Sequence, residues 1–186
     1  MIKVKKAVFK KYHNMLHKAI LLALLLLPLA SHAQFRSTTW GMSANNVKGL
    51  EKTEFIGEGK DMLAYKTHFV GTKMMLYFMF QNDRLYRGSY VSMEIHVNPK
   101  WHIKDYERCK LQLEQYFGKP LRDESVSKND TVEEDPEKQG MAILSGDLML
   151  ISSWVNAESK VTIICSGDGK KVTLEITYEA SNTQGK

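Results

Sequence analysis

The chain of 186 residues lacks most of the residue patterns that mark common classes of site. It has only two cysteines, Cys109 and Cys165, and none where its apolar leader ends, the place of the cysteine in a lipid-anchored protein. It has no G-x-S-x-G or H-E-x-x-H motif. Outside the leader its histidines are His68, His96 and His102, and none is spaced as a zinc pair. We therefore predict a protein that is not an enzyme and has no cofactor or metal site.

A surplus of positive charge is also missing once the leader is set aside. The whole chain has 26 basic and 21 acidic residues, but six of the basic residues are leader lysines. The remaining 20 basic residues stand against all 21 acidic ones. Without a basic surplus to neutralise phosphates, the charge offers no support for nucleic acid or an anionic membrane as a partner.

Residues 1–33 have the three parts of a signal peptide. The leader lysines precede the apolar run 19–30, and Ser31 and Ala33 occupy the two positions that a signal peptidase reads. A membrane span needs about 20 apolar residues, more than this run contains. We predict cleavage after Ala33, a periplasmic or secreted protein, and no transmembrane segment in the mature chain. A start at Met15 would give a shorter leader with the same cut.

The mature chain, residues 34–186, suits one exported domain with a core of its own. Its composition breaks once, at the segment 122–140, "RDESVSKNDTVEEDPEKQG", which is acidic and poor in apolar residues. Such a composition predicts a mobile, solvated loop. The pair Glu133-Glu134 within it is interpreted as solvated, because nothing there would tune a carboxyl pKa for catalysis.

Alternation of apolar and polar residues predicts six strands. They are residues 62–70, 73–81, 85–97, 147–155, 160–166 and 170–179. In the third of them, Val91, Met93, Ile95 and Val97 would share the buried face.

Two helices complete the predicted fold. Ser43 is a suitable N-cap for a helix over 44–50, and apolar residues recur at three- and four-residue steps from about His102 to Phe117. Gly118 and Pro120 would end the second helix. Helix plus three-stranded meander therefore occurs twice, which predicts an α+β fold with two helices packed on a mostly antiparallel sheet of six or seven strands.

The two cysteines are expected inside this fold. Cys109 lies on the apolar stripe of the second helix, and Cys165 lies on the apolar face of a strand. If that helix packs on that sheet, both thiols enter one buried layer. Export permits a disulfide between Cys109 and Cys165 without requiring one, so both states stay open.

The cluster Met74, Met75 and Met79 could suggest a Cu(I) site. On a strand, however, Met74 points away from the other two, so core filling is the preferred interpretation. Trp40 has two interpretations as well. It can be buried at a strand-to-helix corner with Gly41, or it can be exposed as the residue that anchors a partner.

The segment from Phe35 to Glu51, "F-R-x-x-x-W-G-M-S-x-x-x-V-x-x-x-E", resembles the opening of a group of small exported bacterial proteins of unknown function. "YERCKLQLEQYFGKP" is similar to their helix ending in aromatic-Gly-x-Pro, and "GDLMLISSWVNAESKVTII" followed by "LEITYEAS" is similar to their closing strands. The resemblance implies an exported protein with this fold, and it implies no activity.

Two functions remain open on the sequence. The first is a non-catalytic module that binds a protein or another component of the bacterial cell envelope. The second is a carrier of a small hydrophobic ligand, in a cavity between sheet and helices lined by methionine and aromatic residues. The oligomeric state is not predicted.

Overall fold

The computed structural model describes residues 35–128 and 135–181. The predicted leader and the pair Glu133-Glu134 lie outside these ranges. In the described ranges the helices are α2 (Ala44–Leu50), α3 (Lys100–Phe117) and α4 (Pro136–Ser145). The strands are β1 (Glu54–Gly59), β2 (Met62–Phe69), β3 (Thr72–Gln81), β4 (Arg84–Ser92), β5 (Arg122–Ser127), β6 (Leu148–Val155), β7 (Ser159–Gly167) and β8 (Val172–Ala180).

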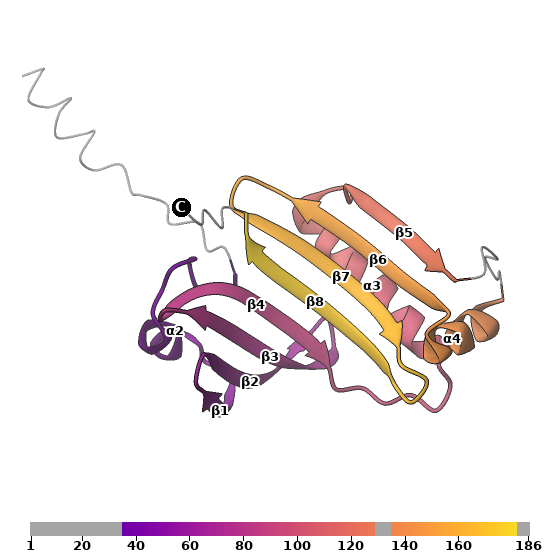
Figure 1. Ribbon diagram of the computed structural model, residues 1–186, viewed down its shortest axis with the longest axis horizontal. Helices are drawn as coiled ribbons and strands as arrows, with labels where there is room; N and C mark the ends of the chain where they lie inside the picture. Colours follow the sequence, from indigo (N-terminus) through magenta and orange to yellow (C-terminus); the bar gives the residue numbers. More distant parts are fainter. Residues whose placement is uncertain (1–34, 129–134, 182–186) are drawn as a thin grey trace, which may run out of the picture. The chain divides into compact units, whose positions relative to one another are not determined.

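The strands form one antiparallel sheet in the order β1-β2-β3-β4-β8-β7-β6-β5 (Figure 1). Each half of the chain contributes four consecutive strands. The halves join where β4 pairs with β8, from Arg87 opposite Glu179 to Val91 opposite Glu175. The last strand of each half is therefore central, and the first strand of each half, β1 or β5, is an edge.

This architecture corrects the predicted one. The described residues hold three helices and eight strands, so a helix with a three-stranded meander does not occur twice. β1 was missed because Phe55 and Ile56 are adjacent and both exposed, which breaks the alternation. A bulge in the β1–β2 pairing at these positions accounts for that break.

The predicted loop 122–140 is also wrong in part. Residues Arg122–Ser127 form β5, and Pro136 begins α4 with Asp135 as its N-cap. β5 is almost entirely exposed, so its side chains carry no alternation that would predict a strand. Pairing with β6 along its whole length defines it instead.

The third predicted strand is shorter than expected. β4 ends at Ser92, and the apolar alternation that continues over 93–97 does not form a strand. Ile95 is 94% exposed and Val97 104% exposed, and Val91 is only half-buried, on the side of β4 opposite buried Tyr90, so the expected buried face is wrong. Pairing between β4 and β8 stops at Val91, and an apolar pattern without a paired neighbour is not sufficient for a strand.

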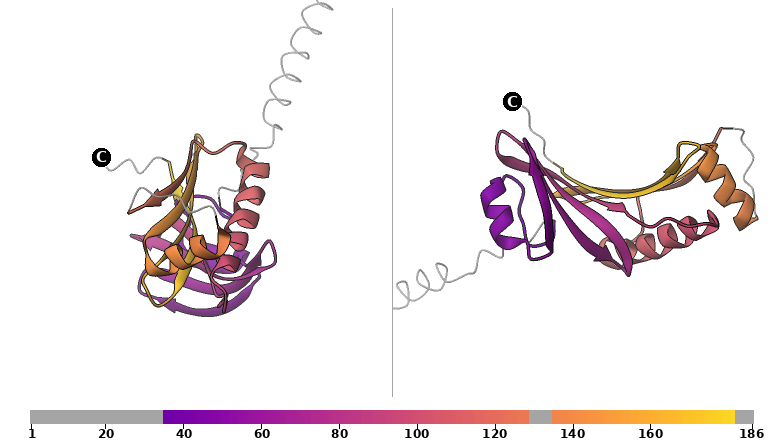
Figure 2. Two further views of the ribbon diagram at one scale, coloured as in Figure 1. Left: turned by 90° about the vertical axis from the view of Figure 1, so that its right-hand side faces the viewer. Right: turned by 90° about the horizontal axis from the view of Figure 1, so that it is seen from below.

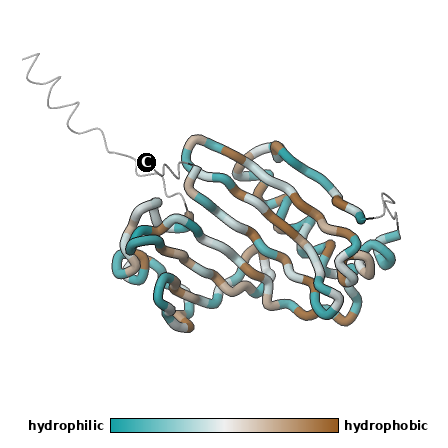
Figure 3. The backbone as a smooth tube through the Cα atoms, viewed as in Figure 1, coloured by the Kyte–Doolittle hydropathy of each residue, from teal (hydrophilic) through white to brown (hydrophobic). Residues whose placement is uncertain are grey.

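One face of the sheet carries the core. Its central rows contain Leu76, Tyr90, Ile176 and Ile163, which follow one another across β3, β4, β8 and β7. Apolar positions recur along these strands in Figure 3. Phe35 lies over Gly88, where a Cβ atom would come within 2.0 Å of the phenyl ring.

All three described helices add buried residues to this same core, namely Val47 from α2, Cys109 and Leu113 from α3, and Ile143 from α4. In Figure 1, α3 lies behind β6 and β7, so the viewer faces the other side of the sheet. That side has no helix of the described chain over it. The strands β6–β8 bend with α3 on the outside of the bend, which makes the uncovered face concave (Figure 2, right).

Candidate functional site

Trp40 belongs to a structural corner. It is half-buried and stacks on Phe35 with the ring centroids 6.4 Å apart. Its indole N–H donates to the Glu158 carbonyl at 3.1 Å and to the Ser159 hydroxyl at 3.0 Å. Gly41 has a φ of 85°, the left-handed region that favours glycine. The motif thus joins the N-terminal segment to the turn between β6 and β7, and nothing in this geometry supports the partner contact considered for Trp40.

Arg36 and Glu51, near the two ends of the segment from Phe35 to Glu51, pair with each other. Arg36 donates from Nε and Nη2 to Glu51 at 2.6 and 3.0 Å, and the Glu51 side chain is only 3% exposed. The backbone N–H and hydroxyl of Thr53 also donate to Glu51. Burial alone would raise the pKa of Glu51, but the hydrogen bonds from Arg36 and Thr53 outweigh it, and the pKa lies below its ordinary value.

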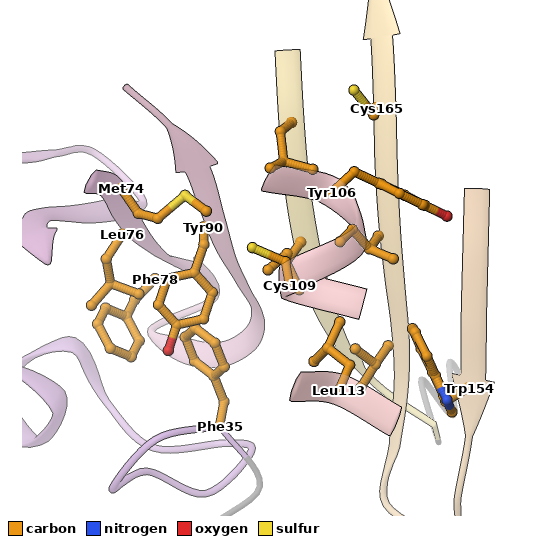
Figure 4. Packing of buried hydrophobic residues seen from close by; sticks show 14 of the residues in the cluster. Phe35, Met74, Leu76, Phe78, Tyr90, Tyr106, Cys109, Leu113, Trp154 and Cys165 are labelled. Atoms are coloured by element: carbon orange, nitrogen blue, oxygen red, sulfur yellow. The ribbon is translucent and has the colours of Figure 1, made fainter. Parts of the chain in front are cut away.

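The predicted burial of Cys109 and Cys165 is confirmed. Both are 0% exposed, and both point into the layer between α3 and the sheet (Figure 4). They are free thiols, so the disulfide considered on the sequence is not formed. Burial raises the pKa of each thiol to about 12. A thiol in this state is a poor nucleophile, and neither cysteine forms a reactive site.

Two of the three histidines come together in a way the sequence did not predict. His96 and Asp105 are joined by a 2.7 Å hydrogen bond, and Arg108 pairs with the other carboxylate oxygen. The ring of His102 lies 4.6 Å from that of His96, and His102 is buried rather than on the surface. Asp105 was missed as a partner because the chain reverses between His96 and α3. The third histidine, His68, is exposed as expected.

The methionine cluster divides between the two faces of β3. Met74 is completely buried in the core, whereas Met75 and Met79 are half-buried on the uncovered face. The prediction that Met74 points to the opposite face from Met75 and Met79 is thereby confirmed. Among the described residues, no group of three or more histidine, cysteine or acidic side chains is placed to hold a metal ion.

The uncovered face of the sheet is the largest surface of the described chain that its own helices leave free. We define its centre by one row of residues that are neighbours across the strands. In order from β2 to β6 these residues are Ala64, Tyr77, Ser89, Thr177, Thr162 and Ser153. They are small or hydroxylated, Tyr77 is the one aromatic residue among them, and none carries a charge. Half-buried Met75, Val91 and Ile164 lie in the next row.

Charged residues on this face are mostly paired with each other. Arg87 donates to Glu175 at 3.2 Å and lies 3.7 Å from Glu179. Toward the two edges, Lys66 pairs with Glu54, and Arg122 pairs with Glu124 at 2.7 Å. The face therefore has no surplus of one sign that would attract a polyanion.

Several polar groups on the uncovered face have no partner within the described chain. The Oγ of Ser89 and the Nε of Arg87 are buried and make no hydrogen bond. The hydroxyls of Tyr77 and Tyr86 make none among the described residues either. Tyr86 lines a hollow of about 360 Å³ together with Val155 and others at the end of the face. Exposed aromatic rings with free hydroxyls are typical of protein interfaces.

No helix within residues 35–128 or 135–181 is long and apolar enough to cross a bilayer. Comparison of the chain with protein-family models, with curated proteins and with solved structures found no match in any of the three. The likeness of the opening motif to small exported proteins therefore stays a prediction.

Proposed function

We propose that this protein is an exported, non-catalytic binding module of the bacterial cell envelope, and that its uncovered concave face binds a folded protein. The observation that carries this proposal is that an eight-stranded sheet has all three described helices on one side. The other side offers half-buried Met75, Tyr77 and Met79 at its centre. Export rests on the tripartite leader, residues 1–33.

The charge of the face favours a protein over other envelope components. Its charged side chains are mostly paired, as Arg87 is with Glu175, so the face offers no surplus of cations to an anionic lipid surface or a polyanion. Methionine, tyrosine and arginine are enriched in the centres of protein interfaces, where the rim is polar. The arrangement of this face fits that composition.

The alternative function, a hydrophobic-ligand carrier, has less support. It requires an open space between sheet and helices lined by methionine and aromatic residues. Met74, Leu76 and Phe78 line that layer and have no exposed surface (Figure 4). The ring of Phe35 fills the space above Gly88, with centroids 5.2 Å from Phe78 and 4.9 Å from Tyr178. The layer is a packed core.

Site-specific photocrosslinking tests the proposal. A photoreactive residue replacing Tyr77, in the protein exported by its host, should give one main crosslinked protein species from the envelope fraction. Purified partner should then bind the wild-type protein with a Kd in the micromolar range or tighter, and Tyr77→Glu should weaken that binding at least tenfold by burying a charge. The intact mass of the exported protein should begin at Gln34.

Tyr116→Glu is the matched control, because Tyr116 is 75% exposed on α3, away from the uncovered face. It should leave partner binding unchanged. Equal loss with both variants, or crosslinks only to a second copy of this chain, would contradict a protein partner at this face.

A further inference from the structure

The sheet opens into a wedge at one end of its central strand pair. β4 and β8 are paired only as far as Val91 and Glu175. Beyond this point the chain turns toward β3, where the Met93 N–H donates to the Lys73 carbonyl at 2.9 Å. β8, by contrast, continues to pair with β7 back to Val172. The separation leaves a pocket of about 430 Å³ between the segment 93–97 and the start of β8.

Part of the lining of this wedge is apolar. Val91, Met93 and Val97 come from β4 and its extension, Val172 comes from β8, and Leu144 comes from the end of α4. The volume lies within the range of about 300–1,000 Å³ that is typical of small-molecule sites. The pocket is thus large enough for a short hydrocarbon chain.

The rest of the lining contains two lysines and one glutamate. Lys170 and Lys171, in the turn between β7 and β8, are exposed and form no ion pair with any described residue. Glu94 is the acidic residue in the lining, and its carboxylate accepts a hydrogen bond from the Lys73 N–H at 3.1 Å. Two lysines and one glutamate therefore line the pocket, and Asp168 in the same turn interacts electrostatically with Lys171.

His102 is the buried polar group of the wedge. It lines the pocket and is only 6% exposed, and its ring makes no hydrogen bond with a described residue. Its neighbour His96 is held by Asp105, which also binds Arg108, so this carboxylate is fully engaged elsewhere. The imidazole therefore keeps a donor and an acceptor that a ligand in the pocket can use.

We propose that the wedge binds a small amphipathic carboxylate, with its carboxylate among Lys170, Lys171 and His102 and its hydrocarbon part against the apolar walls. The two lysines supply charge, and the imidazole supplies a directional donor in a partly dry site. The walls contributed by Val91, Leu144 and Val172 select for an apolar tail. This site shares Val91 with the uncovered face, but its existence does not depend on the partner proposed above.

The site should take up a proton when it is filled. Burial and the nearby His96 ring lower the pKa of His102, while Asp105 opposes them. The other charged groups facing the pocket are Lys170, Lys171 and Glu94. A bound carboxylate beside the imidazole would favour the protonated ring and raise its pKa. Affinity should therefore increase as the pH falls from 8 to 6, a range in which the ligand stays ionised.

Octanoate is a suitable probe for calorimetry with the mature chain. At pH 6.5 it should bind one site with a Kd below about 1 mM, as expected for a ligand of this size. Octylamine, with the opposite charge, and acetate, without the tail, should bind at least tenfold more weakly. Equal binding of octanoate and octylamine, or no octanoate binding below 10 mM, would overturn the proposal.

Two sets of variants locate the site. Lys170→Ala together with Lys171→Ala, both exposed and thus compatible with folding, should weaken octanoate binding about tenfold or more. Lys119→Ala, an exposed lysine just beyond the other end of α3, is the matched control and should change nothing. His102→Gln should flatten the dependence of affinity on pH. Unchanged affinity in the double lysine variant would place the carboxylate elsewhere and refute the site, whether or not the His102 variant folds.

Discussion

Phe35 shows how a single residue can determine the packing of its surroundings. Its ring lies 4.9 Å from that of Tyr178 and 5.5 Å from that of Tyr90, so it contacts both strands at the centre of the sheet. The space it occupies exists because position 88 is a glycine, whose Cβ would otherwise meet the ring. Large aromatic side chains contribute strongly to core stability. The segment after the predicted leader is therefore part of the core.

The ion pair between Arg36 and Glu51 yields a pH-dependent prediction. The pKa of Glu51 in the folded protein lies below its unfolded value of about 4.3. The pair's contribution is therefore complete above that value and is lost as the pH falls through the folded pKa. Glu51→Gln should lower the free energy of unfolding at pH 7 by about 2–3 kcal/mol, because Arg36 is left without its charge partner.

Urea unfolding between pH 7 and pH 3 measures this effect. The wild type should lose stability below about pH 5, and Glu51→Gln should lack this part of the loss. Glu58→Gln is the control, since the pair of Glu58 with Lys48 is exposed and worth about 0.5 kcal/mol or less. If the free energy of unfolding fell equally with pH in the wild type and in Glu51→Gln, the loss of stability in acid would not come from the Arg36–Glu51 pair.

Residue-level patterns predicted some of these contacts and missed others. Ser43 was expected as an N-cap, and its side chain accepts from the Asn46 N–H. Val47, expected on the apolar face of α2, is completely buried. The pairs Arg36–Glu51 and His96–Asp105 were missed, because each depends on a chain reversal that no local period encodes.

At the scale of elements, α4 depends on close backbone contact. A Cβ atom on Gly140 would lie 2.5 Å from the Lys100 backbone nitrogen, at the start of α3. A Cβ atom on Gly167, in β7, would lie 2.1 Å from the Ile143 carbonyl of α4. Since these neighbours are backbone atoms, a small side-chain movement would not relieve either contact.

Gly140→Ala should therefore destabilise the protein by about 2 kcal/mol, as overpacking does elsewhere. Helix propensity alone has the opposite sign, because alanine in a helix is favoured over glycine by about 1 kcal/mol. The free energy of unfolding of Gly140→Ala, measured by chemical denaturation, shows which of the two effects is larger. Met141→Ala, at a neighbouring position that is 56% exposed, should change stability by no more than about 0.5 kcal/mol. A stabilised Gly140→Ala would show that α4 does not approach α3 this closely.

Elements also differ in how far the sequence predicts them. β2 and β3 were expected because large apolar residues recur at alternate positions along each, such as Leu63 and Tyr65 in β2. β5 has no such pattern, and only its pairing with β6 orders it. The segment 93–97 has the pattern without the pairing, so the same rule predicted a strand that does not form. Alternation of apolar and polar residues predicts which side chains would share a face. A strand forms only if a neighbouring strand also pairs with it.

At the scale of the molecule, the two halves share one core. Phe35, Met74 and Tyr90 from the first half and Trp154, Ile163 and Ile176 from the second belong to the same buried cluster. The predicted recurrence of helix and meander was wrong in its strand number. It placed both meanders in one sheet but did not specify that β4 and β8 would join them, because pairing between distant strands leaves no local signal.

Neither half should fold alone. A fragment of residues 34–98 would expose Phe35 and Tyr90 along an unpaired β4, and a fragment of residues 99–186 would expose Tyr178 in the same way. We expect each fragment to give a poorly dispersed amide NMR spectrum, and an equimolar mixture to recover the dispersion of the intact chain. A cooperative thermal transition in the isolated 34–98 fragment would contradict a shared core.

The position of β8 has a consequence for the order of events during biosynthesis. Of the described strands, β8 leaves the ribosome after the other seven, yet it takes a place in the middle of the sheet, between β4 and β7. Until β8 is made, β4 and β7 each present an open edge, and Arg87 cannot pair with Glu179. Closing such a distant contact is slow compared with forming hairpins. The export proposed above fits this topology, because a chain whose sheet stays incomplete until β8 is made remains unfolded, which is the state that a secretion apparatus for unfolded substrates accepts.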